Sequence, residues 1–474
     1  MTLYYGKRFS TYPFWHDYET FGVSPAKDRP SQFAGIRTDL DLNIIGEPEN
    51  FYCKQSTDYL PSPEAILVTG ITPQLANQKG MVETEFMGRI NAIFTQPNTC
   101  VVGYNSLRFD DEVSRYGFYR NFIDPYAREW QNGNSRWDII DLVRACYAFR
   151  PEGINWPLKE DGSPSFKLEH LTQANGLSHE QAHDAMSDVY ATIAIAKLIK
   201  EKQPKLYDYY FELRNKKKVA ELIQGDFMQP LVHVSSKISA ANGCVTLIAP
   251  VAPHPTNKNA MICINLAMDL SPLIDLTVAE IVERMYTPRN ELAPDELPIP
   301  LKQIHLNKCP FIGTPKLLSE AVAQRHQFDM DFARSQYKLF KQHPELRDKM
   351  QAVFDVNDHP AVTDPDLMLY SGGFFSHADK AKMEMIRNTK AENLAALNLD
   401  FDDPRLSQML FRYRARNYPE TLSHDESMQW REFCQQRLSD ADYVINLENL
   451  LEETSENEHK QKLLKALCLY LQSL

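Results

Sequence analysis

Apolar residues in the first part of the chain alternate between two spacings. Short runs typical of strands occupy residues 13–18, 33–38 and 100–104, whereas residues 82–94 and 185–200 show helix-like spacing. Strand-like runs that alternate with helical ones favour an α/β domain. We therefore expect the chain to begin with such a domain.

The remainder of the chain changes pattern twice. Residues 201–222 form a charged helical stretch, and residues 232–266 are strand-like, with frequent Pro, Asn and Gly breaks. After Pro360 the apolar spacing becomes helical again. We predict an α/β domain, a small and mostly β domain, and a helical domain, which occupy residues 1–201, 202–357 and 358–474.

Composition supports a folded protein of several domains. A length of 474 residues exceeds what one hydrophobic core usually supports. The longest apolar stretch, residues 191–199, falls short of the ~18 residues that a membrane span needs. Lys7 and Arg8 are followed by mixed aromatic and polar residues, so the apolar segment of a signal peptide is missing. We expect a cytoplasmic protein without membrane contact.

Cysteine usage and charge narrow the class further. The eight cysteines are scattered without CxxC pairs, in a chain large enough to fold without disulfides, so we expect reduced thiols. The formal net charge of -12 disfavours a protein that grips nucleic acid over its whole surface, because phosphate binding needs a positive field. Any nucleic-acid site is therefore expected to be a local basic channel.

Two carboxylates stand close together in the segment HDYETFG at residues 16–22. Asp17 and Glu19 lie at the end of an aromatic-rich strand, where positions i and i+2 point to the same face. Holding two carboxylates side by side is unfavourable unless a proton or a cation such as Mg²⁺ lies between them. The alternative, a solvated strand end, is equally probable for this segment alone.

A third candidate, Asp110, follows an apolar run in the segment NSLRFDDE at residues 105–112. The predicted order of elements around Asp110 is a strand, a turn and a helix. An aspartate at a helix start also has a purely structural explanation, because its charge complements the helix dipole. Taken alone, the structural explanation is the stronger one for Asp110.

His183 and Asp188 lie at the start of a predicted helix whose apolar face carries Ala185, Val189 and Ile193. A histidine just ahead of a helix can deprotonate a metal-bound water, because its ordinary pKa of roughly 6.5 is close to working pH. The alternative is a capping or hydrogen-bonding histidine, the commoner case for a lone residue.

The joint pattern is more specific than its parts. Four carboxylates and one histidine follow the order Asp-x-Glu, Asp, His-x4-Asp within the predicted α/β domain. This pattern fits a two-metal site, in which one ion activates the attacking water and the other stabilises the leaving oxygen of a phosphodiester. Phosphodiester hydrolysis is the reaction class that the pattern favours.

The chain resembles the DEDDh exonucleases and, within them, the bacterial exonuclease I family. The resemblance covers essentially the whole chain. It is carried by the segments HDYETFG (16–22), GYN (103–105), RFDDE (108–112), RPEGINWP (150–157), HDAM (183–186), NKCP (307–310) and YRARN (413–417).

The resemblance implies an RNase H-like exonuclease domain, an SH3-like β domain and a helical C-terminal domain that enclose a single-strand channel. It also implies a monomer that hydrolyses single-stranded DNA from 3′ to 5′ into 5′-mononucleotides, in DNA repair and recombination. By the family pattern two Mg²⁺ ions, for which Mn²⁺ can substitute, bind to Asp17, Glu19 and Asp188. Asp110 completes the acidic site, and His183 is the general base.

Single strands are held by positive grooves interleaved with aromatic platforms, and this chain offers candidates for both. Each is also explained as a solvated cation or a half-buried aromatic. By resemblance, the expected substrate contacts are Glu19, Thr20, Phe21, Arg115, Tyr126, Trp130, Arg144, Lys167, Lys216, Asn259 and Tyr370. The run Arg412, Arg414 and Arg416 is more simply explained as an exposed face or as salt bridges.

Two departures from the family pattern concern contacts and not the metal site. Lys167 stands where the family has arginine, which keeps the charge but loses the planar fork that grips a phosphate. The segment YSGGFF at residues 370–375 differs from the usual YNGFF. We expect altered contact strength at the first position and an altered loop at the second.

The resemblance also implies one protein partner and leaves two rival functions. Arg150 and Tyr209 match positions associated with the acidic C-terminal tail of single-stranded DNA-binding protein. One rival is an RNase of the same fold that trims RNA ends, and the 2′-OH is what would distinguish its substrate. The other is an inactive binding scaffold, which should lack one or more of the metal carboxylates that this chain retains.

Overall fold

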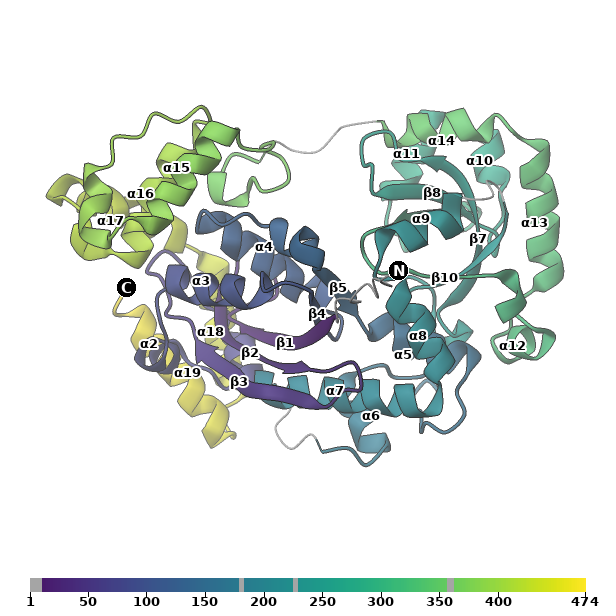
Figure 1. Ribbon diagram of the computed structural model, residues 1–474, viewed down its shortest axis with the longest axis horizontal. Coiled ribbons are helices and arrows are strands. Elements are labelled where there is room, and N and C mark those ends of the chain that lie inside the picture. The colour runs from purple at the N-terminus through teal and green to yellow at the C-terminus, as the bar shows by residue number, and fades with distance from the viewer. Residues whose placement is uncertain (1–10, 179–182, 225–228, 356–361) are drawn as a thin grey trace, which may run out of the picture. The chain divides into compact units, whose positions relative to one another are not determined.

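A computed structural model describes residues 11–178, 183–224, 229–355 and 362–474 (Figure 1). Its contacts divide the chain into two compact units. The first contains residues up to 135, 179–190 and 360–474, and the second contains residues 136–178 and 191–359. The boundary that we predict between residues 357 and 358 lies outside the described residues.

A five-stranded sheet carries the predicted carboxylates, and all of it except residues 136–138 belongs to the first unit. Its strand order is β3-β2-β1-β4-β5, with β1 antiparallel to β2 and parallel to β4. The predicted strand runs at residues 13–18, 33–38 and 100–104 are confirmed. The strands are β1 (Tyr12–Thr20), β2 (Pro30–Thr38), β3 (Ile44–Tyr52), β4 (Thr99–Gly103) and β5 (Ser135–Asp138).

An aromatic core covers one face of β1, so only the opposite face can carry an active site. Phe14 and Tyr18 of β1 pack with Phe33 of β2 and with Phe86 and Phe118 of two helices that cover the sheet (Figure 1). Because alternate strand residues point to opposite faces, Asp17 and Glu19 point away from this core, whereas His16 packs into it. The helices of this part are α1 (Pro63–Thr69), α2 (Pro73–Lys79), α3 (Glu83–Phe94) and α4 (Asp110–Arg120).

The C-terminal segment is helical, as predicted, and packs on the first unit's N-terminal part. Leu464 and Leu467 share one core cluster with Phe21, Tyr59 and Ile66. The segment's helices are α15 (His377–Asn388), α16 (Arg405–Asn417), α17 (His424–Leu438), α18 (Ala441–Glu453) and α19 (Glu458–Leu471).

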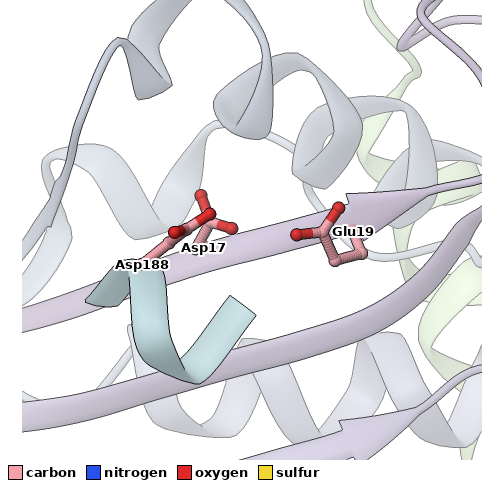
Figure 2. Close-up of side chains that lie close together, drawn as sticks. All are labelled: Asp17, Glu19 and Asp188. Carbon is pink, nitrogen blue, oxygen red and sulfur yellow. The ribbon is translucent and has the colours of Figure 1, made fainter. Parts of the chain in front are cut away.

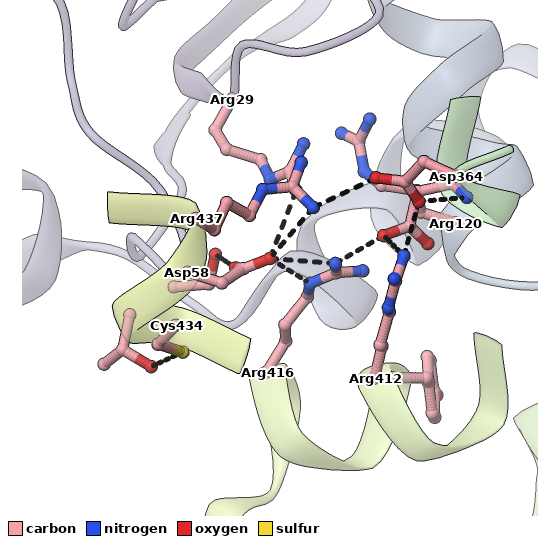
Figure 3. A network of polar contacts seen from close by, with 12 residues as sticks. Arg29, Asp58, Arg120, Asp364, Arg412, Arg416, Cys434 and Arg437 are labelled. Carbon is pink, nitrogen blue, oxygen red and sulfur yellow. Dashed lines mark hydrogen bonds and ion pairs between the residues drawn. The ribbon is translucent and has the colours of Figure 1, made fainter. Parts of the chain in front are cut away.

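A buried ion network joins the same two segments (Figure 3). The Arg416 guanidinium donates to Asp58 at 2.8 Å and to Asp366 at 2.5 Å, and neither carboxylate is more than 2% exposed. Arg412 donates to Asp366 at 3.0 Å, and Arg29 lies 3.8 Å from Asp58. The salt-bridge explanation of the basic run is therefore confirmed, with Arg414 donating to Glu426 as well.

The second unit contains a five-stranded antiparallel sheet in the order β10-β6-β7-β8-β9. Its strands are β6 (Leu231–Val234), β7 (Val245–Pro253), β8 (Ala260–Asn265), β9 (Leu301–His305) and β10 (Phe311–Gly313). The strand-like region at residues 232–266 is thus confirmed.

The expectation of a mostly β domain over residues 202–357 is wrong, because helices take up much of this range. In α13 (Met330–Gln342) the buried residues Ala333, Gln336 and Phe340 follow the spacing of one helix face. The other helices of this range are α8 (Pro204–Glu212), α9 (Lys216–Gln224), α10 (Ser271–Asp275), α11 (Val278–Tyr286), α12 (Glu320–Arg325) and α14 (Leu346–Phe354).

Three further helices complete the described chain. They are α5 (Ile140–Phe149), α6 (Leu168–Ala174) and α7 (Ala185–Lys202). No disulfide joins any of the eight cysteines, all of which lie in the described part. Among the described residues no helix is long and apolar enough to cross a membrane.

Candidate active site

Three carboxylates converge at the face of β1 that points away from the aromatic core (Figure 2). Asp17 and Glu19 lie two positions apart on β1, and Asp188 lies in the first turn of α7. One carboxylate oxygen from each lies within 4.8 Å of those of the other two. Strand alternation explains why the first two share a face, and the helix start brings the third to them.

Asp110 is fixed to the strand that carries two of these carboxylates. It is the first residue of α4, which follows β4 and a short 3₁₀ turn. Its Oδ1 accepts a hydrogen bond of 3.1 Å from the backbone N–H of Tyr18, between Asp17 and Glu19. With an exposed fraction of 5%, Asp110 belongs to the buried wall of the acidic site.

The acidic site concentrates negative charge where water is scarce. Burial raises the pKa of Asp17 well above its usual range, and neighbouring carboxylates, of which Asp110 contributes most, raise it further. Burial and the charge of Asp188 raise the pKa of Glu19 to about 9. A bound cation would offset this repulsion, and the three side chains offer only carboxylate oxygens, which hard divalent cations prefer. The residues present therefore fit a divalent metal site.

The start of α7 carries two more polar residues. His183 is exposed and has a left-handed backbone, with φ of 68°. Asp184 caps the helix, because its Oδ2 accepts a hydrogen bond of 3.1 Å from the backbone N–H of Ser187. From the sequence we assign Asp184 no role. Its position as a helix cap could have been predicted, because an aspartate stands three residues before Ser187 at the start of an apolar helix pattern.

Thr20 and Phe21, expected at the substrate, lie where β1 ends. The Thr20 hydroxyl donates to the carbonyl oxygen of Gly22 at 2.6 Å. The Phe21 ring is 1% exposed in the core cluster with Leu464 and Leu467, so it offers no open face on which a base could stack. Substrate contact by these two residues stays a prediction.

Three of the residues expected to contact the DNA lie close together in the first unit, namely Arg115, Tyr126 and Tyr370. Arg115 donates to Glu129 at 2.8 Å and to the Tyr370 hydroxyl at 2.9 Å, and its guanidinium lies 5.4 Å from the Tyr126 ring centroid. Arg115 is thus already paired with a carboxylate. Trp130 is 67% exposed and free to offer its ring to a ligand.

The remaining residues that we expect to contact DNA lie in the second unit. Arg144 is buried and donates to Asp141 at 2.6 Å, whereas Lys167 is exposed and lies 3.7 Å from Glu169. The Lys216 ammonium donates to Asn259 Oδ1, so the structure brings these two predicted residues together.

The two residues predicted to bind a protein partner also lie in the second unit. Arg150 is exposed. Tyr209 is 38% exposed, and its hydroxyl donates to the carbonyl oxygen of Ile312 at 2.6 Å. The Tyr209 hydroxyl therefore already has an acceptor, although the residue as a whole stays partly exposed.

Comparison with known proteins covers nearly the whole chain. Family models match in three places: "Exonuclease" at residues 14–196, "Exonuclease I SH3-like domain" at 214–356 and "Exonuclease I C-terminal domain" at 363–474. Exodeoxyribonuclease I of Escherichia coli K12 is 49% identical over 473 residues, or 99% of each chain. That of Haemophilus influenzae is 50% identical over 456 residues, or 95% of this chain and 96% of its own.

Solved structures agree with the sequence matches. A crystal structure of E. coli exonuclease I with a dA16 oligonucleotide has a TM-score of 0.95 at 49% identity, covering 98% of this chain and 99% of that one. The zinc-bound form of an E. coli exonuclease I–ssDNA complex has a TM-score of 0.94 at 48% identity, with the same coverage. A crystal structure of SSB/exonuclease I with the inhibitor CFAM has a TM-score of 0.91 at 48% identity, again with this coverage.

These matches confirm the predicted combination of an RNase H-like exonuclease domain, an SH3-like domain and a helical C-terminal domain. The acidic cluster lies within the part matched by the exonuclease model. The chain therefore belongs to the exonuclease I family of exodeoxyribonucleases.

Proposed function

We propose that this protein is a metal-dependent 3′→5′ exonuclease that hydrolyses single-stranded DNA to 5′-mononucleotides. The observation that carries the proposal is the convergence of Asp17, Glu19 and Asp188 within 4.8 Å, in a chain of the exonuclease I family. The crystal structure of a relative with a dA16 oligonucleotide supports single-stranded DNA as the substrate.

The proposed mechanism assigns each residue a separate task. Asp17, Glu19 and Asp188 would hold two divalent ions, and the buried carboxylate of Asp110 would complete the acidic wall. Bound ions of this kind activate a water and stabilise the leaving oxygen of the phosphodiester. His183 would accept the proton of the attacking water, a task that its exposed position allows.

We propose Mg²⁺ as the physiological ion, with Mn²⁺ as a substitute. The cluster consists of carboxylates alone, and oxygen-only sites suit Mg²⁺ and Mn²⁺ better than soft metals. The zinc-bound form of a relative's complex with single-stranded DNA supports binding of a divalent ion. Two ions fit four acidic residues better than one ion does, because each added cation offsets part of the repulsion.

The chain's other expected properties belong to the same proposal. A crystal structure of SSB/exonuclease I supports binding of single-stranded DNA-binding protein. We propose that Arg150 and Tyr209 bind the acidic C-terminal tail of that partner protein. We further propose a cytoplasmic monomer that acts in DNA repair and recombination. The domains would occupy residues 1–201, 202–357 and 358–474, a division supported by the three family matches.

Two rival functions are less well supported. An RNase that trims RNA ends would share the carboxylate site, but the match to exodeoxyribonucleases covers 99% of this chain. An inactive scaffold is disfavoured because Asp17, Glu19, Asp110 and Asp188 are all retained.

The test is a degradation assay on 5′-labelled single-stranded DNA, beside the matched duplex and the ribo-oligonucleotide. We expect Mg²⁺-dependent shortening of the single DNA strand from its 3′ end, lost in EDTA and in Asp17→Ala. Asp331→Ala, which removes an exposed acid far from the cluster in sequence, is the matched control and should behave as wild type. Binding without shortening would favour the scaffold, and shortening of RNA alone would favour the RNase.

A further inference from the structure

Gln32 lies beside the metal carboxylates on the neighbouring strand. In the β1–β2 register its Cα is the partner of the Glu19 Cα, and its side chain is 1% exposed. Directly opposed residues on paired strands project to the same face of the sheet. Gln32 is therefore a buried amide on the same face as Glu19 and Asp17.

The amide of Gln32 connects this face to the start of α7. Its Nε2 donates to Asp184 Oδ1 at 3.3 Å and to Asn50 Oδ1 at 3.0 Å. The other oxygen of Asp184, Oδ2, accepts from the backbone N–H of Ser187 at 3.1 Å. The Asp184 carboxylate thus accepts one hydrogen bond from the sheet and one from the first turn of α7.

That first turn contains the third metal carboxylate. The backbone N–H of Asp188 donates to the carbonyl oxygen of Asp184 at 3.0 Å, so the position of Asp188 follows from that of Asp184. His183 directly precedes Asp184. Whatever fixes Asp184 against the sheet also fixes the backbone on either side of it.

Helix capping alone does not explain an acid at this position. Asparagine caps helices about as well as aspartate does. The charge of Asp184 adds to the repulsion that Asp17 and Glu19 already experience, and its partner Gln32 is neutral. An ionised acid with a neutral, hydrogen-bonded partner keeps the local field negative, which favours a bound cation.

We propose that Gln32 and Asp184 form a positioning pair that holds Asp188 and His183 in register with Asp17 and Glu19 for metal binding. The inference rests on the proposed function and adds residues that support the metal ligands without touching the metal. Partners of this kind typically change metal affinity 10–100-fold when they are removed.

The test exchanges the two functional groups. Gln32→Glu places two carboxylates in contact, whereas Gln32→Glu with Asp184→Asn restores one carboxylate and one amide with the hydrogen bond reversed. Gln32→Met removes the hydrogen bond at similar size and adds no charge. Gln436→Glu, at an exposed position of α17, is the control for an added charge.

The first readout is Mn²⁺ binding without DNA, followed by electron paramagnetic resonance. We expect Gln32→Glu and Gln32→Met to weaken binding of Mn²⁺ about 10-fold or more, and the double variant to return to within about 3-fold of wild type. The second readout is kcat and KM on single-stranded DNA at saturating metal, where the fall should appear in kcat. A purely structural role would lower Tm and leave the Mn²⁺ titration unchanged.

Two results would overturn the inference. One is a Gln32→Met variant, folded by circular dichroism, whose Mn²⁺ titration matches that of wild type. The other is a double variant that binds Mn²⁺ as weakly as Gln32→Glu. Failure of wild type itself to bind Mn²⁺ or to degrade DNA would instead overturn the proposed function, so the two failures are distinguishable.

Discussion

The backbone N–H of Tyr18 donates a hydrogen bond of 3.1 Å to Oδ1 of Asp110. This bond joins the first residue of α4 to the strand position between the two β1 carboxylates. The same carboxylate therefore has a structural task, which an amide oxygen could also perform, and a chemical task, which needs the negative charge. The two tasks can be separated by mutation.

Asp110→Asn should keep the bond to Tyr18 and remove the charge, whereas Asp110→Ala removes both. We expect both variants to lose at least about 100-fold in kcat, which corresponds to about 3 kcal/mol of transition-state stabilisation. Only the alanine variant should lose stability, by about 1–3 kcal/mol for an unsatisfied buried N–H. Steady-state kinetics and urea unfolding measure the two effects. Wild-type kcat in Asp110→Asn would show that the charge has no chemical task.

Metal-free protein should become more stable when the acidic cluster loses a charge. Burial raises the pKa of Asp17. Ionisation of Asp17 therefore destabilises the folded state once the pH exceeds the ordinary pKa of an aspartate. Asp17→Asn should therefore raise the Tm in EDTA, by about 1 °C for each kcal/mol recovered in a chain of 474 residues. Mg²⁺ should raise the Tm of wild type and have less effect on the variant. Thermal unfolding with EDTA and with Mg²⁺ is the measurement, and equal Tm values in EDTA would contradict the prediction.

The ion network predicts a large effect at one arginine. Arg416→Met leaves Asp58 buried without its closest cation, and removal of one partner of a buried pair costs about 3–5 kcal/mol. Arg334→Met is the matched control, because the Arg334–Asp331 pair is exposed and should change stability by less than about 1 kcal/mol. Urea unfolding of both variants gives the comparison. Similar losses in the two would show that burial of the network contributes nothing.

Acid should unfold the protein through the same network. Burial alone would raise the pKa of Asp58, but the Arg416 and Arg29 guanidinium groups outweigh it and hold the pKa well below its usual range. Arg416 and Arg412 likewise outweigh burial at Asp366. Because these folded pKa values are depressed, the stabilisation is complete above the ordinary aspartate pKa of about 4 and is lost as the pH falls below it. A Tm series in buffers from neutral to about pH 3 measures this, and a flat profile below pH 4 would contradict it.

Local rules were sufficient for part of the site. The two-residue period of a strand predicts that Asp17 and Glu19 share a face, and the apolar spacing of α7 predicts that Asp188 lies in its first turn. Nothing local indicates that the helix start meets the strand, because that depends on tertiary packing. The resemblance to a known family supplied that step.

Other features depend on relations that a single sequence does not reveal. The role of Gln32 depends on the β1–β2 register, which places it opposite Glu19. The partners of Arg412 and Arg416 come from residues 58, 364 and 366, so the basic run could not be distinguished from an exposed face. The helical stretch predicted at 201–222 is confirmed, but the helices of residues 271–354 were missed because the strand-like stretch at 232–266 dominated the pattern.

The contact between Asp58 and Arg416 also has a consequence for the order in which the chain is made. The two residues are 358 positions apart, so Asp58 leaves the ribosome long before its partner exists. At about 5–20 residues per second, the interval is about 20–70 s. During that time the emerging segment contains Asp58 with Arg29 but without Arg416, so the burial of this carboxylate is not fully compensated until the last segment is translated. A chain stopped before Arg416 would keep every metal carboxylate and still lack this part of its core.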